Sequence, residues 1–133
     1  MRLSVLEQIS LFAGRTPRRA VEDIEDTEDI EDTVRLARGL EDSGYHRFWL
    51  AERHSTSAFA SSAPGLLIMH MLDATDRIRA GSGGIMAMRH GSLQVAERLA
   101  TLTTLFPGRV DLGLGRAPGG LSRRGRRTAT VIP

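Results

Sequence analysis

The chain contains no cysteine, which excludes disulfides, thiolate metal sites and cysteine nucleophiles. It also contains no lysine, so that all 18 basic residues are arginine. No apolar run approaches the roughly 20 residues that a membrane helix needs, and the N-terminus has no signal-peptide pattern. We therefore expect a cytoplasmic protein that has no membrane partner. The 4 histidines are scattered without metal-ligand spacing, so the sequence assigns no metal site.

The composition is that of a globular domain. With 133 residues, 41% of them hydrophobic and 26% charged, the chain is long enough to bury a single core. The net charge is only +2, but half of the 16 acidic residues lie in Val21–Asp32 and five of the 18 arginines in Arg116–Arg127. The basic end, residues 120–133, lacks the interleaved aromatic side chains of a nucleic-acid-binding segment. We therefore expect a solvated, disordered tail in preference to one that binds nucleic acid.

An acidic repeat occupies residues 21–33, where single apolar or threonine residues are separated by Glu-Asp pairs. A spacing of three drifts around a helix of 3.6 residues per turn, so these positions do not hold one face. The acidic side chains suit a helix N-terminus, where the helix dipole favours negative charge. The repeat is interpreted as an insertion that lengthens or precedes a helix ending near Ser43, with Gly44 as the stop signal.

Strand and helix patterns alternate through the rest of the chain. Short apolar runs between turn residues predict strands, and apolar residues spaced by three and four predict helices. The helix from Pro64 is apolar nearly all round, which predicts that neighbouring elements cover it, and Ser92 is a candidate cap for the next helix. The predicted strands are residues 3–6, 46–51, 77–86 and 110–114, and the predicted helices are residues up to 43, 64–76 and 92–106.

This α/β order predicts a parallel sheet with right-handed crossovers, for which two architectures compete. An open doubly wound sheet that binds a dinucleotide needs the fingerprint G-x-G-x-x-G. Gly113, Gly115 and Gly119 are one residue too widely spaced for it, and Gly81–Gly84 lacks a third glycine in register. The other architecture is a (β/α)8 barrel, whose active site is built at the carboxyl ends of the strands.

Each predicted strand runs directly into polar or glycine residues. Four strands that end in this way at one rim favour the (β/α)8 barrel over the doubly wound sheet. The residues concerned are Glu7, Gln8, Glu52, Arg53, His54, Gly83, Gly84, Gly115 and Arg116.

Five stretches together carry a resemblance to a known family: "LSVLEQ", "GYHRFWLAERH", "ASSAPGLLI", "RIRAGSGGIM" and "VAERLATLTTLFPGRVDLGLGRAPG". In combination they resemble the luciferase-like monooxygenases, the bacterial-luciferase-type flavin- or deazaflavin-dependent oxidoreductases. The resemblance runs from Arg2 to about Gly119. It implies a partial barrel domain at residues 1–119 with the acidic insertion at 21–33, followed by the tail at 120–133. The fold it implies is the N-terminal part, β-α-β-α-β-α-β, of a (β/α)8 TIM barrel.

The resemblance implies that the barrel mouth binds reduced flavin, either FMN or a deazaflavin, and uses it with molecular oxygen to oxidise a small organic substrate. In the family two histidines follow the Ala-Glu of the second strand. Here Arg53 replaces the first of them, so that Glu52, Arg53 and His54 are the candidate catalytic residues. Arg53 either holds an anionic intermediate or leaves the site inactive. The other two histidines, His46 and His70, are interpreted as structural, His70 within the covered helix.

Cofactor-binding residues are implied in the same way. Gly83-Gly84 matches a non-proline cis peptide bond under the flavin ring, and the alternative is an ordinary bulge at the strand end. Arg116, beside Gly115, matches an arginine that pairs with the flavin phosphate, and the alternative is a surface salt bridge. His90, which is kept within "MAMRHGSL", completes the candidate set.

A complete barrel typically needs about 250 residues, whereas this chain provides four predicted strands. The first and fourth strands are therefore expected to have unpaired edges. We expect a homo-oligomer or a complementing second chain to cover them, and a truncated protein that is weakly active or inactive alone. The alternative is a non-catalytic barrel fragment that acts as the assembly partner of a second chain.

Overall fold

The computed structural model describes residues 1–9, 28–54 and 59–116. Strands and helices alternate within them, as the sequence predicts. The expectations for most of the acidic repeat, for Gly119 and for the tail at 120–133 fall outside the described residues. The elements are β1 (Ser4–Glu7), α2 (Glu28–Asp42), β2 (Arg47–Leu50), α3 (Pro64–Asp73), β3 (Arg79–Met86), the 3-10 turn η2 (Ala87–Arg89), α4 (Ser92–Leu105) and β4 (Val110–Gly115).

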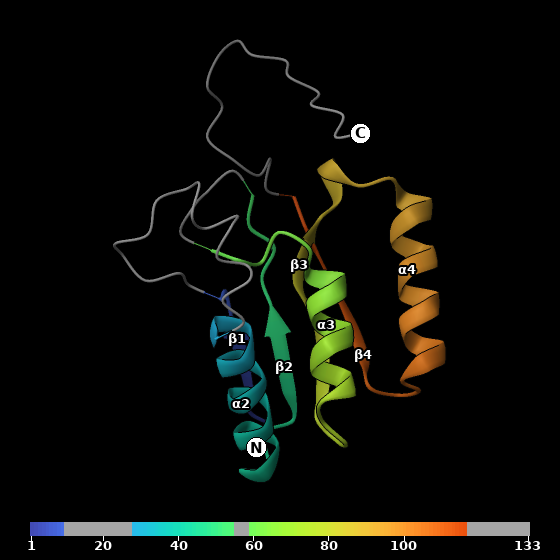
Figure 1. Ribbon diagram of the computed structural model, residues 1–133. Coiled ribbons are helices and arrows are strands. Elements are labelled where there is room, and N and C mark those ends of the chain that lie inside the picture. The colour runs from blue at the N-terminus through green and yellow to red at the C-terminus, as the bar shows by residue number, and fades with distance from the viewer. Residues whose placement is uncertain (10–27, 55–58, 117–133) are drawn as a thin grey trace.

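The four strands form one parallel sheet in the order β1-β2-β3-β4. Val5 is aligned with Phe48, Phe48 with Ala80, and Ala80 with Val110, so this row of side chains shares one face of the sheet. Helices α2 and α3 lie in front of the sheet and α4 stands beside them (Figure 1). All three helices pack on this single face, which is the arrangement of a barrel segment, whereas a doubly wound sheet carries helices on both faces.

The core lies between the sheet and these helices. The side chains of Phe48 and Leu50 are 0% exposed, and they pack with Met71 and Leu72 of α3. Full burial of an aliphatic or aromatic side chain of this size stabilises the fold by roughly 1.5–3 kcal/mol. Among the helices that the structure describes, none has the length and apolar character needed to cross a membrane.

The helix ends follow local sequence signals in most places. Helix α2 stops at Asp42, and Gly44 takes a positive φ of 78°, a conformation that favours glycine. Pro64 occupies the first turn of α3 as predicted. The prediction that Ser92 caps α4 is wrong. Gly91 occupies the N-cap position, and no side chain caps this end of the helix.

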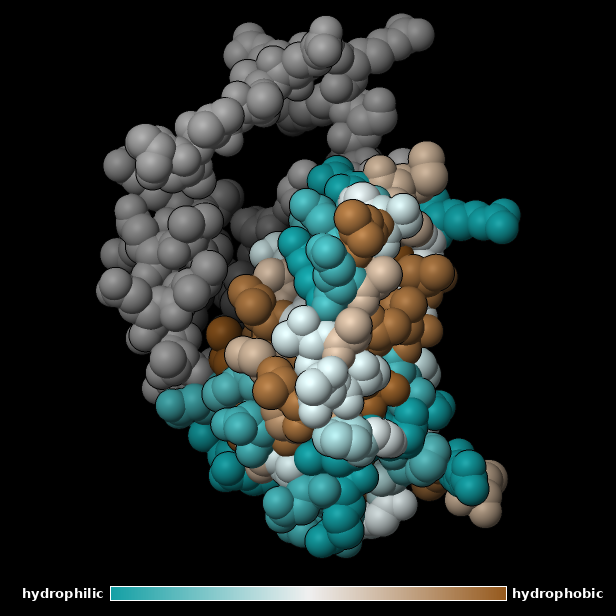
Figure 2. Space-filling view, turned by 90° about the vertical axis from the view of Figure 1, so that its right-hand side faces the viewer, coloured by the Kyte–Doolittle hydropathy of each residue, from teal (hydrophilic) through white to brown (hydrophobic). Residues whose placement is uncertain are grey.

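Several apolar side chains are more exposed than the sequence predicts. The apolar opening run, residues 3–6, is typical of a buried strand, yet Leu6 in β1 is 53% exposed, and in β4 Leu114 is 63% exposed. Both strands are edges of the described sheet, so each lacks a neighbour on one side. Helix α3 is covered on one side only, which leaves Leu66 68% exposed. His70 is also exposed, so the prediction that it lies within a covered helix is wrong. Figure 2 shows hydrophobic side chains on the face that carries α4.

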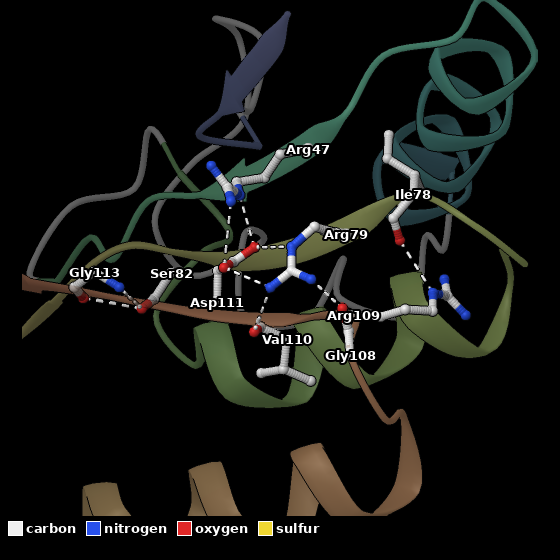
Figure 3. A network of polar contacts seen from close by, with 9 residues as sticks. All are labelled: Arg47, Ile78, Arg79, Ser82, Gly108, Arg109, Val110, Asp111 and Gly113. Carbon is white, nitrogen blue, oxygen red and sulfur yellow. Dashed lines mark hydrogen bonds and ion pairs between the residues drawn. The ribbon is translucent and has the colours of Figure 1, made fainter. Parts of the chain in front are cut away.

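The face of the sheet opposite the helices carries an ionic network at its amino-terminal edge (Figure 3). Asp111 accepts hydrogen bonds from Arg47 Nε at 2.6 Å and from Arg79 Nε and Nη2, both at 2.8 Å. Arg79 also donates to the backbone carbonyl of Val110 at 3.2 Å. These bonds connect β2, β3 and β4 across the sheet. In a barrel this end of the strands serves stability, whereas the carboxyl ends build the active site.

Candidate active site at the carboxyl edge

Because the four strands are parallel, their carboxyl ends meet at one edge of the sheet. Glu52 and His54 directly follow β2, Gly83 and Gly84 lie in the second half of β3, and Arg116 follows β4. The structure therefore places the candidate residues at the same edge, as the sequence predicts.

Glu52 is the centre of a three-residue cluster at this edge. Its side chain is 0% exposed. Oε1 accepts hydrogen bonds from Nε2 of His54 and, at 2.6 Å, from Nε2 of His90, while Oε2 accepts one from the backbone N–H of Met86 at 2.7 Å. The Met86 bond ties the segment after β2 to the end of β3. The cluster is therefore built across two neighbouring strands.

The local backbone explains how Glu52 and His54 come together. Residues 51–54 belong to neither a helix nor a strand, and in an extended segment side chains two positions apart point to the same side. His90 reaches the same carboxylate because it directly follows η2 in an extended conformation, with φ −119° and ψ 144°. The sequence predicts His90 as a cofactor-binding residue and Glu52 as a catalytic one, and no pattern in it indicates their contact.

The protonation of the cluster follows from its hydrogen bonds. Burial raises the pKa of the Glu52 carboxyl, but the hydrogen bonds from His54, the Met86 N–H and His90 outweigh burial and leave this pKa below its usual value. Glu52 is then a carboxylate, which can only accept hydrogen bonds. Both histidines must therefore carry a proton on Nε2, and in a neutral ring Nδ1 is left as an acceptor.

Arg53 lies apart from this cluster, although it is predicted as a candidate catalytic residue together with Glu52 and His54. Its Nε and Nη2 donate to Oε1 of Gln8 at 3.0 and 2.8 Å, and its guanidinium carbon lies 5.6 Å from the centre of the Phe59 ring. The alternation that brings Glu52 and His54 together turns the residue between them to the other side. Arg53 thus links the ends of β1 and β2.

The peptide bond between Gly83 and Gly84 is cis, as the resemblance implied. The alternative interpretation is a bulge at the strand end, and the pairing of β3 with β4 does shift register between Ser82 and Ile85. A Cβ atom on Gly83 would lie 2.8 Å from Leu6 Cδ1 and 3.1 Å from Trp49 Cβ. Leu6 Cδ1 ends a flexible side chain that can move aside, so packing does not by itself require glycine at position 83. A Cβ atom on Gly84 would instead lie 2.8 Å from the backbone carbonyl of Gly113, so the close approach of β4 requires glycine at position 84.

Arg116 is exposed at the end of β4. The guanidinium makes no hydrogen bond or ion pair with any other residue in ranges 1–9, 28–54 and 59–116. Within these ranges no acidic side chain pairs with Arg116, so the alternative of a surface salt bridge has no support there. Gly115, directly before it, has no atom closer than 3.6 Å to the position of an added Cβ, so packing does not require glycine there.

A cleft of ≈ 400 Å³ lies on the helix side of the sheet, between α3, α4, β3 and β4. Most of its walls are apolar, including Ile68, Leu99 and Leu102. Of the candidate residues, His90 alone lines it. The cleft is therefore separate from the glycine and arginine residues at the strand ends.

Comparison with known proteins identifies the class of this fold and site. The sequence matches the Luciferase-like monooxygenase family over residues 7–125. The chain belongs to this family. It is similar to the N-acetyl-S-alkylcysteine monooxygenase of Bacillus subtilis (strain 168), with 42% identity over 120 residues that make up 90% of this chain and 33% of that protein. The chain thus spans about a third of the length of this relative.

Solved structures agree on the fold. The crystal structure of apo-MsnO8 superposes with a TM-score of 0.75 at 40% identity, covering 87% of this chain and 32% of that one. The oxygenating constituent of 3,6-diketocamphane monooxygenase from Pseudomonas putida, solved with FMN, gives 0.72 at 18% identity, covering 88% of this chain and 30% of that one. An F420-dependent secondary alcohol dehydrogenase, solved with an F420-acetone adduct, gives 0.63 at 18% identity and covers 85% and 31%. The described strands and helices are the N-terminal part of a (β/α)8 barrel.

Proposed function

We propose that this chain supplies the first part of a reduced-flavin site in a flavin-dependent monooxygenase that oxidises a small organic substrate. The observation that carries the proposal is the convergence of the Glu52–His54–His90 cluster, the Gly83-Gly84 peptide and Arg116 at one edge of four parallel strands. In barrels of this kind the active site lies at this edge. Membership of the luciferase-like monooxygenases supports the reaction class.

The residues present fit a flavin in two respects. Arg116 offers an exposed guanidinium that is unpaired within the described part of the chain, and a planar, permanently charged fork suits a phosphate group. Gly83 is exposed and carries no side chain, so the Gly83-Gly84 backbone can approach a flat ring closely. FMN is proposed over a deazaflavin because the family's "LGLGRAPG" motif is retained; structures with this fold hold either FMN or F420.

Reduced flavin, when bound, supplies the two electrons with which one atom of molecular oxygen enters the substrate and the other leaves as water. The chain's own residues would control protons beside it. Glu52 fixes both imidazole rings through their Nε2 atoms. Nδ1 of His54 is then available to accept a proton from a reacting group, as a general base does. Arg53 is held by Gln8 and would shape the mouth beside β1.

A second candidate function is that of an assembly partner without activity of its own. The observation that favours it is the exposed apolar surface of the two edge strands, where Leu6 is 53% and Leu114 63% exposed. Parallel strands of a barrel are normally paired on both sides, and part of a barrel's phosphate site comes from its later loops. Further strands, from a second copy or a complementing chain, would cover these edges and complete the site.

Titration of FMN with the purified chain, followed by quenching of flavin fluorescence, separates the two functions. If this chain binds flavin by itself, saturable binding is expected, and Arg116→Gln should weaken it about 10-fold, since one charge-assisted contact contributes roughly 1.5 kcal/mol. The matched control is Arg77→Gln, which removes the same charge from an exposed arginine just before β3, at the opposite edge. Equal affinity of the wild type and both variants contradicts the contact between Arg116 and the flavin phosphate, and no binding at all contradicts an independent flavin site and favours the assembly partner.

A further inference from the structure

The cluster at the end of β2 has a property that flavin chemistry does not require. The donor atoms of Glu52, His54 and His90 all lie within 4.8 Å of one another. Both imidazole rings present the same atom, Nε2, to Oε1 of the same carboxylate. We propose that Glu52, His54 and His90 form a binding site for a divalent first-row transition-metal ion of the zinc class.

The donor set selects the kind of ion. Two imidazole nitrogens and one carboxylate oxygen match the His₂Glu ligand sets that bind zinc in proteins, and imidazole also suits Fe²⁺, Ni²⁺ and Cu²⁺. Mg²⁺ and Ca²⁺ prefer shells made of oxygen ligands and are disfavoured by two nitrogen donors. Three protein ligands leave a fourth tetrahedral position for water or another small ligand.

The geometry requires the three donor atoms to rearrange. Zinc–ligand bonds of about 2.0–2.1 Å place tetrahedral donors roughly 3.3 Å apart. The separation between His90 Nε2 and Glu52 Oε1 is 2.6 Å, so the carboxylate oxygen and each ring must separate by less than about 1 Å. The donor atoms of His54 and His90, which lie within 4.8 Å of each other, must reach the same separation. The side chains of His54 and His90 are 21% and 19% exposed, which leaves the rings room to move and gives an ion access from solvent.

The surroundings of Glu52 support coordination through Oε1. The backbone N–H of Met86 donates to Oε2 at 2.7 Å, and a hydrogen bond of this kind orients a ligating carboxylate. Coordination through Nε2 moves the ring proton of each neutral histidine to Nδ1. Metal binding therefore replaces the hydrogen bonds from His54 and His90 to Glu52, and the two arrangements exclude each other.

The metal site goes beyond the proposed function, because it needs neither flavin nor oxygen. It predicts that the flavin-free chain of 133 residues, carried on a tag without histidine, takes one Zn²⁺ from a chromophoric chelator. His54→Ala and His90→Ala should each weaken Zn²⁺ affinity by at least about 10-fold, as the loss of a ligand does. His46→Ala and His70→Ala are matched controls outside the cluster, and they should leave the affinity unchanged.

Two further measurements keep the result interpretable. Circular dichroism compares the helix content of each variant with that of the wild type, and Co²⁺ should give visible absorption bands of a four-coordinate site that disappear in His90→Ala. Wild-type protein that is folded but binds no Zn²⁺ overturns the proposal. Binding that persists in both cluster variants, or that falls equally in the His46 and His70 controls, also overturns it. Flavin titration of the same samples tests the proposed function separately.

Discussion

Replacement of Asp111 by asparagine tests the ionic network at the amino-terminal edge of the sheet (Figure 3). Asp111 joins Arg47 to Arg79, and its side chain is 17% exposed against 27% and 28% for the arginines. Burial raises the pKa of Asp111, but hydrogen bonds from Arg79 and Arg47 and the charges of both outweigh it and lower this pKa below its usual value. The carboxylate form is therefore the stabilising one.

The size of the effect lies between two limits. Exposed ion pairs contribute about 0–1 kcal/mol, whereas breaking a buried pair costs about 3–5 kcal/mol because a charge is left unpaired. Asp111 is mostly buried and its two partners are about a quarter exposed, so solvent offsets part of the loss. We expect Asp111→Asn to lower the free energy of unfolding by about 2 kcal/mol.

Urea unfolding followed by far-ultraviolet circular dichroism measures this change. Asp32→Asn is the matched control, because Asp32 pairs with Arg35 on the surface of α2 and their side chains are 61% and 64% exposed. Its removal should change the free energy by less than about 0.5 kcal/mol. A loss in Asp111→Asn no larger than in the control would refute the reasoning that the network stabilises the sheet.

Three further predictions concern single positions. Burial raises the pKa of Glu41, but hydrogen bonds from the backbone N–H groups of residues 76–78 outweigh burial and lower this pKa below its usual value. The Glu41 carboxylate therefore stabilises the folded state above about pH 5, and this stabilisation is lost as pH falls through the folded-state pKa. In urea unfolding at pH 7 and pH 3, Glu41→Gln should therefore be destabilising mainly at pH 7. Gly39→Ala should raise the free energy of unfolding by up to about 1 kcal/mol, because Gly39 lies within α2 and no heavy atom lies within 4 Å of the new Cβ. Gly84→Ala should lower the free energy of unfolding by roughly 1–3 kcal/mol, because the new Cβ meets the backbone of Gly113 at 2.8 Å. Thermal unfolding of both alanine variants checks these signs.

The fold was largely predictable because its signals are local. Gly44 ends a helix where a positive φ is needed, and Pro64 begins the next one. Alternation of strands and helices implied the parallel sheet. Exposure was harder to predict, because it depends on neighbours in space. Leu66 has an apolar side chain in an apolar helix, yet α3 contacts the core along one side only.

The candidate site was predictable in position but not in detail. Placing the functional residues at one edge needed only the direction of the strands. The contact between Glu52 and His90 spans 38 positions in sequence and depends on the turn after β3. Spacing along the chain therefore gives no sign that His54 and His90, which are far apart in sequence, contact the same carboxylate. Arg53 turns away from Glu52 and His54 and donates to Gln8, a contact between the ends of β1 and β2 that no local pattern in the sequence indicates.

The central claim is that the carboxyl edge of the sheet receives the flavin. Chemical-shift changes in ¹H–¹⁵N spectra of the labelled chain upon addition of FMN test it most directly. We expect the backbone amides of Gly83, Gly84, Gly115 and Arg116 to shift most, while those of Arg47 and Arg79 at the opposite edge stay in place. Shifts concentrated at Arg47 and Arg79, or an unchanged spectrum at saturating FMN, would contradict the account.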